Sequence, residues 1–113
     1  MHELSIMDSA MNMALAQARE AGATRIHEIR LRVGALSGVV PEALQFAFEA
    51  LAPGTLAESA KLRMDSVPAR FWCEACQAEF AADDFLAACP HCQTISRHLR
   101  AGRELELASL EIE

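Results

Sequence analysis

The chain has 113 residues, of which 16 are acidic and 10 are basic, and its formal net charge is −6. This length suits one compact domain or a modest core with a small metal-stapled insert, and the acidic balance opposes docking on a phosphate backbone. No apolar run approaches the ~20 residues of a membrane span, and no Lys or Arg precedes Arg19, as a signal peptide would require. We therefore expect a cytoplasmic protein in a reducing compartment.

The first periodic segment predicts a helix. Between Leu4 and Ala18, apolar side chains recur at spacings of three and four, the period of an amphipathic helix. Ser5 is a candidate N-cap and Gly22 a candidate C-terminal stop. The methionines at this spacing fit core packing better than a thioether copper site.

The next segments predict a strand, a second helix and a second strand. Apolar and charged side chains alternate over residues 24–33, which indicates a half-buried strand. Pro41 is suited to the first position of a helix, which Pro53 and Gly54 would end. Alternation returns over residues 61–67 and predicts the second strand.

The last ten residues, 104–113, alternate between acidic and aliphatic side chains and lose phase at Ala108 and Ser109, which suggests a β-bulge. A strand with one apolar face needs a sheet to join. We therefore predict an α+β fold in which two helices pack on a small three-stranded sheet. Residues 1–68 plus 101–113 would form this body, and residues 69–100 an inserted zinc-ribbon-like domain.

Four cysteines dominate the predicted insert. They are the only cysteines in the chain and form two Cys-x-x-Cys pairs twelve residues apart, Cys73, Cys76, Cys89 and Cys92. Four thiolates around one ion suit Zn²⁺, with Zn–S bonds of about 2.3 Å, and they leave no open position for a catalytic water. We expect a structural zinc site. The twelve-residue spacer can still hold a short hairpin between the two Cys-x-x-Cys turns, or knuckles.

Other uses of the cysteines fit less well. Two disulfides would need an oxidising compartment, and a redox Cys-x-x-Cys would need only one pair. His91 could replace a cysteine as ligand, although we expect it to be exposed. Because residues 70–100 contain few large apolar side chains, zinc would supply the folding energy, on the order of 10 kcal/mol.

The amino terminus, Met1-His2-Glu3, is a second candidate metal site. The terminal amine, the amide nitrogen of His2 and its imidazole could form fused chelate rings around Ni(II) or Cu(II), ions that favour nitrogen donors in a plane. The fourth donor would be the amide or carboxylate of Glu3, or another group. Three residues also occur by chance, and the plainer alternative is a solvated histidine at a disordered start.

Several motifs together resemble the HypA/HybF family: the Met-His-Glu start, the Ile-Arg-Leu-Arg-Val-Gly-Ala-Leu-Ser-Gly-Val-Val-Pro-Glu stretch, the two cysteine pairs and the Arg-Glu-Leu-Glu-Leu ending. The resemblance implies a nickel metallochaperone for [NiFe]-hydrogenase maturation, and in some organisms for urease. It implies nickel at Met1, His2 and Glu3 and structural zinc at the four cysteines. It also implies two partners, a HypB-type GTPase and the hydrogenase large subunit.

One departure from the family pattern concerns the knuckles. The family usually has glycine after the second cysteine of each pair, where this chain has Gln77 and Gln93. A non-glycine residue at positive φ costs on the order of 1 kcal/mol, which zinc binding can offset. The zinc assignment therefore stands, and the local knuckle geometry is left open.

Two other classes of function fit the sequence less well. A zinc-ribbon adaptor could bind nucleic acid or a protein complex through aromatic and basic side chains of the insert: Trp72, Phe80, Phe85, Arg70, Arg97 and Arg100. An enzyme is not expected, because His27 and His98 have no evident nucleophile or acid as a partner in the sequence. The chain could be a monomer or a homodimer.

Overall fold

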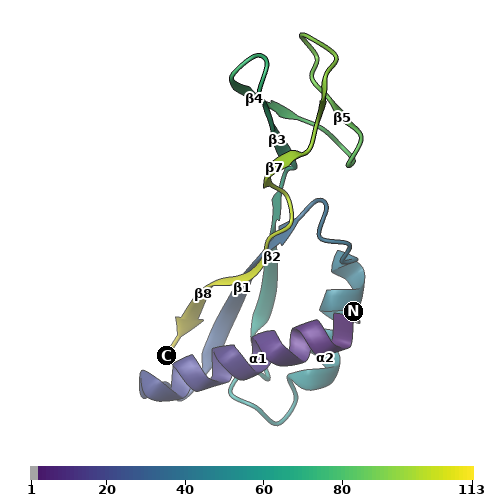
Figure 1. Cartoon of the computed structure of the whole chain (residues 1–113). Coiled ribbons are helices and arrows are strands. Elements are labelled where there is room, and N and C mark those ends of the chain that lie inside the picture. The colour runs from purple at the N-terminus through teal and green to yellow at the C-terminus, as the bar shows by residue number, and fades with distance from the viewer. Residues whose placement is uncertain (1–2) are drawn as a thin grey trace. The chain divides into compact units, whose positions relative to one another are not determined.

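The computed structural model describes residues 3–113, which fold into two helices and eight strands (Figure 1). In chain order these are α1 (Glu3–Glu20), β1 (Ile26–Gly34), α2 (Pro41–Leu51), β2 (Lys61–Val67), β3 (Arg70–Cys73), β4 (Ala78–Ala81), β5 (Ala87–Ala88), β6 (Ile95–Ser96), β7 (His98–Ala101) and β8 (Leu105–Ile112). The chain forms two compact units. The first contains the described residues up to Arg32, Val39–Asp65 and Glu106–Glu113, and the second contains Val33–Gly38 and Ser66–Leu105.

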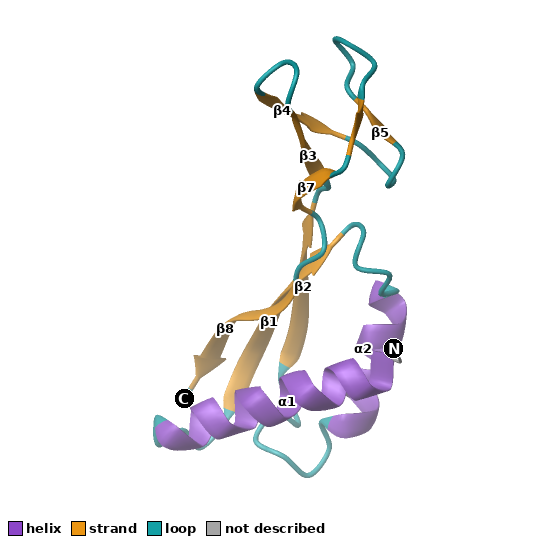
Figure 2. Ribbon diagram, viewed as in Figure 1, coloured by secondary structure: helices purple, strands orange, loops and turns teal. Residues whose placement is uncertain are grey.

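The first unit is a three-stranded sheet with both helices on one face (Figure 2). The strand order is β2-β1-β8, so the strand nearest the carboxyl end lies beside the first strand. The buried side chains come from both helices and the central strand, and they include Met7, Met11, Leu15, Ile26, Ile29, Leu31, Leu44 and Phe48. The predicted α+β fold with two helices on a three-stranded sheet is confirmed.

Helix α1 differs from its prediction at one end. It begins at Glu3, so Ser5 lies inside the first turn and is not the N-cap. An acidic side chain in the first turn interacts favourably with the helix dipole, which helps the helix extend to Glu3. The other end is as predicted: Gly22 has a φ of 72°, and the N–H groups of Gly22 and Ala23 donate to the carbonyls of Arg19 and Ala18. This pair of bonds is the Schellman motif.

Helix α2 has the predicted boundaries. Pro41 occupies its first turn, the helix ends at Leu51, and Gly54 follows with a φ of 80°. Leu44 and Phe48 face the core, as their four-residue spacing predicts.

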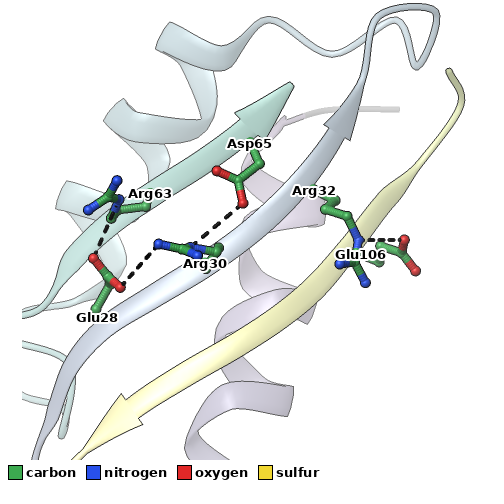
Figure 3. Close-up of polar contacts among 6 residues, drawn as sticks. All are labelled: Glu28, Arg30, Arg32, Arg63, Asp65 and Glu106. Carbon is green, nitrogen blue, oxygen red and sulfur yellow. Dashed lines mark hydrogen bonds and ion pairs between the residues drawn. The ribbon is translucent and has the colours of Figure 1, made fainter. Parts of the chain in front are cut away.

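The face of the sheet turned away from the helices is charged (Figure 3). The predicted alternation of β1 holds, since Ile29 and Leu31 are buried while Arg30 and Arg32 reach carboxylates on neighbouring strands. Arg30 Nε lies 3.6 Å from Asp65 Oδ2, and Arg32 Nε lies 3.0 Å from Glu106 Oε1. A third inter-strand pair, Arg63 with Glu28, is separated by 3.5 Å. Exposed pairs contribute about 0–1 kcal/mol each, so the sheet is held mainly by its apolar face.

Strand β8 changes phase as the sequence predicts. Its half-buried residues are Leu105, Leu107, Ala108 and Leu110, so the alternation shifts by one residue between Leu107 and Ala108. A β-bulge at this point stays a prediction.

The second unit contains two small antiparallel sheets. Strand β3 pairs with β4 and β7, and β5 pairs with β6. Phe71 lies opposite Phe80 in this register, and both rings belong to the small core, whose buried members are Ala69, Phe71, Cys73, Phe80, Ala87 and Cys89. The spacer between the two knuckles does not form the hairpin that its length would allow. Each Cys-x-x-Cys turn itself reverses the chain, so β4 and β5 pair with strands outside the spacer.

The loop after β1 belongs to the second unit. The Gly34 N–H donates to the Glu104 carbonyl and the Leu36 N–H to the Gly102 carbonyl, both at 2.6 Å, and Leu36 packs against the small core. The assignment of one unit to nickel and the other to zinc stays a prediction. Neither described helix is long and apolar enough to cross a membrane.

Candidate metal centre

Four sulfur atoms converge in the second unit. The Sγ atoms of Cys73, Cys76, Cys89 and Cys92 all lie within 4.8 Å of one another. The Cys73 and Cys92 sulfurs are 3.6 Å apart, and those of Cys76 and Cys89 are 3.9 Å apart. Tetrahedral bonds of about 2.3 Å place sulfurs about 3.8 Å apart, so the cluster fits one tetrahedral ion such as Zn²⁺.

Both knuckles adopt a left-handed backbone conformation at the residue after the second cysteine, although that residue is glutamine and not glycine. Gln77 has a φ of 54° and Gln93 a φ of 64°, the left-handed region that glycine adopts most easily. Each side-chain amide turns back on its own knuckle: Gln77 Nε2 donates to the Glu74 carbonyl at 2.7 Å and Gln93 Nε2 to the Pro90 carbonyl at 3.5 Å. The chain therefore keeps the turn without glycine, at a conformational cost of about 1–2 kcal/mol per residue.

The sulfurs occupy unequal environments. Cys73 and Cys89 are buried, whereas Cys76 and Cys92 reach the surface. Hydrogen bonds from the Thr94 hydroxyl and backbone N–H lower the pKa of Cys92 to about 6. Hydrogen bonding with the Cys92 sulfur, then with Cys73 and Cys89, raises the pKa of Cys76 to about 12.

The Cys73 thiol is subject to opposing influences. The Cys76 N–H, 3.4 Å from the Cys73 sulfur, lowers the pKa of Cys73, but burial and the neighbouring sulfurs outweigh it and the net shift is upward. Without a cation, proximity of the sulfurs thus raises the pKa values of Cys73 and Cys76. A divalent ion would offset this rise because it stabilises all four thiolates together.

The histidines of the second unit lie outside the sulfur cluster. His91 is exposed, as predicted, and the metal-ligand group found in the described residues consists of cysteines alone. His98 Nε2 lies 3.7 Å from Glu74 Oε1. In the first unit, His27 Nε2 lies 2.7 Å from Glu113 Oε1. Both histidines pair with exposed carboxylates, which is a surface role.

The candidate nickel residues are described only in part. Met1 and His2 lie outside the described residues. Glu3 is the first residue of α1, not ahead of the helix as the sequence suggested, and its Oε2 lies 3.5 Å from the Val40 N–H. As a first-turn residue, Glu3 has a backbone N–H without an acceptor inside the helix.

Comparison with known proteins identifies the family. The family described as "Hydrogenase/urease nickel incorporation, metallochaperone, hypA" matches residues 1–112. The chain belongs to the HypA family. Its predicted relationship is therefore confirmed, and the nucleic-acid adaptor hypothesis is not favoured.

Curated HypA proteins align along the whole chain. "Hydrogenase maturation factor HypA" of Picosynechococcus sp. is 47% identical over 112 residues, covering 99% of each chain. The protein of the same name from Acidithiobacillus ferrooxidans is 38% identical over 113 residues and covers both chains completely.

Two solved structures share the fold. The solution structure of the Ni metallochaperone HypA from Helicobacter pylori has a TM-score of 0.70 at 23% identity, covering 99% of this chain and 97% of that one. A second, titled "Solution structure of HypA protein", has a TM-score of 0.75 at 22% identity, covering 99% and 96%. At these identities the likeness establishes the fold.

Sequence reasoning missed one residue of the HypA cysteine site. Thr94 follows Cys92 by two residues, and its hydroxyl oxygen lies 3.3 Å from the Cys92 sulfur. A hydroxyl two residues beyond the last cysteine was the available signal.

Proposed function

We propose that this chain carries Ni(II) at Met1, His2 and Glu3 and delivers it during maturation of [NiFe]-hydrogenase, with urease as a second possible client. Membership of a family described by nickel incorporation is the observation that carries the proposal. The chain itself would perform no chemistry on a substrate, so it is not proposed to be an enzyme.

The chemistry of the terminus supports nickel as cargo. The amine of Met1 and the amide and imidazole nitrogens of His2 would supply three donors, and planar nitrogen donors favour Ni(II). The backbone nitrogen of Glu3 is a reasonable fourth donor, because a first-turn N–H is free of intrahelical bonding. The Glu3 carboxylate near the Val40 N–H would then serve to fix the start of the helix.

A structural zinc ion is the second part of the proposal. The cysteines Cys73, Cys76, Cys89 and Cys92 would hold it, since their sulfur spacing fits tetrahedral coordination. When bound, the ion would supply folding energy to a unit whose buried core has only six residues.

The two sites would differ in exchange. A few ligands at a chain end can release an ion to an acceptor, whereas a closed four-sulfur cage releases its ion only when the surrounding fold opens. This difference suits transferable nickel and resident zinc.

We also infer the partners and the location. Membership of a hydrogenase maturation family supports a HypB-type GTPase and the hydrogenase large subunit as partners. We propose a cytoplasmic protein, as a monomer or homodimer, that binds neither membranes nor nucleic acid.

Nickel binding can be tested at the terminus itself. Isothermal titration of untagged, zinc-loaded protein with Ni²⁺ should give one stoichiometric site. A one-residue extension before Met1, or His2→Ala, should abolish that site, because each removes a chelating nitrogen from its place. Metal analysis should show the same zinc content in all three proteins.

A His91→Ala variant is the matched control, because it removes another exposed imidazole. It should bind nickel like the parent chain. The proposal fails if the extended chain and His2→Ala both bind Ni²⁺ with the parent stoichiometry.

A further inference from the structure

The second unit carries a pocket for which the proposed function gives no use. It has a volume of about 240 Å³ and is lined by residues of β3, β6, β7 and the adjoining turns: Trp72, Cys73, Glu74, Thr94, Ile95, Ser96, Arg97 and His98. We propose that this pocket docks one apolar side chain of a partner polypeptide, and that Arg97 pairs with a carboxylate next to that side chain.

The walls of the pocket are suited to an apolar group. Trp72 is the only tryptophan of the chain and is half-buried, while Ile95 leaves 48% of its surface exposed. Aromatic side chains with one face held in place are common anchors of protein interfaces. Arg100 holds the indole in this way, with its guanidinium carbon 4.6 Å from the ring centroid.

The floor of the pocket is fixed before any ligand arrives. The Ser96 hydroxyl is buried, donates to the Trp72 carbonyl and accepts from the His98 N–H at 3.2 Å. Thr94, beside Cys92, ties another wall to the sulfur cluster. A pre-formed pocket binds with a smaller entropic cost than a mobile one.

The size of the pocket decides between a small molecule and a side chain. Pockets for drug-sized ligands and cofactors measure about 300–1,000 Å³, above the volume found here. A single aliphatic or aromatic side chain presented by a polypeptide is the better fit.

The charged residues around the pocket indicate which group of the partner lies next to its apolar side chain. Glu74 is the acidic group among the lining residues, and its carboxylate lies 3.7 Å from His98. Arg97 is exposed, and none of the ion pairs found among residues 3–113 involves it. A free guanidinium beside an apolar pocket matches a carboxylate, with which arginine forms paired hydrogen bonds.

Nucleic acid is a poorer occupant. A base could stack on Trp72, but the chain carries a net charge of −6, Glu79 lies opposite Trp72 in the register of β3 and β4, and Glu74 lines the pocket. These carboxylates would repel the many phosphates of a nucleic acid. A peptide with one carboxylate would need only a single ion pair, with Arg97.

The test uses full-length zinc-loaded protein and the blocked tripeptide N-acetyl-Gly-Phe-Glu-amide. Trp72 emission is excited where phenylalanine does not absorb, so the only tryptophan reports directly on the pocket. We expect a saturable change with a dissociation constant on the order of 1 mM, as for one anchored side chain. The peptide with Gln in place of Glu should bind about two- to fivefold more weakly.

Variants locate the contact. Arg97→Gln should weaken the Glu peptide about two- to fivefold and leave the Gln peptide unchanged. Arg19→Gln, which removes another exposed arginine from α1, should change neither. Ile95→Ala should weaken both peptides, and its unchanged zinc content would establish that the unit is folded.

Three outcomes would overturn the proposal. These are no saturable response to the Glu peptide, equal effects of Arg97→Gln on both peptides, or tighter, salt-dependent binding of a single-stranded oligonucleotide at Trp72. No nickel is present, so the result is separate from the test of the terminal site.

Discussion

Gln77 and Gln93 hold the two knuckles in a backbone conformation that favours glycine. Their φ values of 54° and 64° are strained for any residue with a Cβ, yet the sulfur cluster forms around them. The side-chain amides recover part of the cost by bonding to carbonyls of the same turn. At this scale the left-handed backbone of both turns forms although neither position is occupied by glycine.

Replacing each glutamine with glycine should stabilise the zinc-loaded second unit. Gln93→Gly should gain about 1 kcal/mol, and Gln77→Gly should gain less, because it gives up the shorter hydrogen bond. Thermal unfolding followed by Trp72 emission measures both. Gln45→Gly inside α2 is the control; followed by far-UV circular dichroism, it should lose about 1 kcal/mol. A loss of stability in Gln93→Gly would contradict the strain argument.

Thr94 favours the thiolate form of Cys92 in the folded second unit. Its hydrogen bonds lower the pKa of Cys92 to about 6, whereas the pKa values of Cys73 and Cys76 are raised. At pH 7 Cys92 is therefore a thiolate while Cys73 and Cys76 carry protons. Below pH 6 Cys92 is protonated as well, so zinc must displace an additional proton and binds more weakly.

Zinc retention should therefore depend on pH. When the zinc-loaded protein is acidified in the presence of a coloured zinc indicator, the ion should be lost as protons compete for the thiolates. Thr94→Val removes the hydroxyl that hydrogen-bonds the Cys92 sulfur, so the pKa of Cys92 rises and the variant should lose zinc at a higher pH than the parent. Equal midpoints for parent and variant would mean that Thr94 does not stabilise this thiolate.

Between elements, backbone meets backbone where the end of β1 lies against the segment before β8. A Cβ on Gly34 would overlap the carbonyl group of Gly102 and the backbone nitrogen of Glu104, in a region where two backbone hydrogen bonds of 2.6 Å join the two segments. Gly102 in turn has a φ of 123° and lies against Ala69. Glycine is required at both positions because backbone, and not a flexible side chain, fills the space.

Gly34→Ala should accordingly destabilise the second unit by about 2 kcal/mol or more, since rigid backbone must move. Gly54→Ala is the matched control: Gly54 has a φ of 80° but nothing within 4 Å of a Cβ, so only the conformational cost of about 1 kcal/mol applies. Chemical denaturation followed by Trp72 emission and far-UV circular dichroism measures the two. The close-contact argument fails if the two variants lose equal stability.

In the molecule as a whole, stability comes from two different sources. The first unit buries a core of helix and sheet side chains, whereas the second has a small hydrophobic cluster of six buried residues that includes two of the four cysteines. A core of that size rarely folds unaided, so the metal would hold the second unit.

Removing the metal with a strong chelator should unfold the second unit and leave the first folded. Trp72 emission should shift to longer wavelength, while the far-UV circular dichroism of α1 and α2 persists, because both helices belong to the first unit. Cys76→Ser, which deletes one ligand, should reproduce the effect. If the helical circular dichroism signal is lost together with the shift in Trp72 emission, the two units unfold together and the prediction is wrong.

The sequence by itself determined the elements with strong periodicity or punctuation. Alternation fixed β1, Pro41 fixed the start of α2, Gly22 fixed the end of α1, and the paired cysteines identified the metal cluster. These signals are local, because side-chain period, proline geometry and left-handed glycine act within a few residues.

Only the tertiary structure decided the partners of those elements. Residues distant in sequence come together in β8 beside β1 and in the strands that flank each knuckle. The same is true of the contact of Leu36 with the core of the second unit and of the pocket at Trp72. Their energies come from packing and backbone hydrogen bonds between segments, which no local pattern encodes.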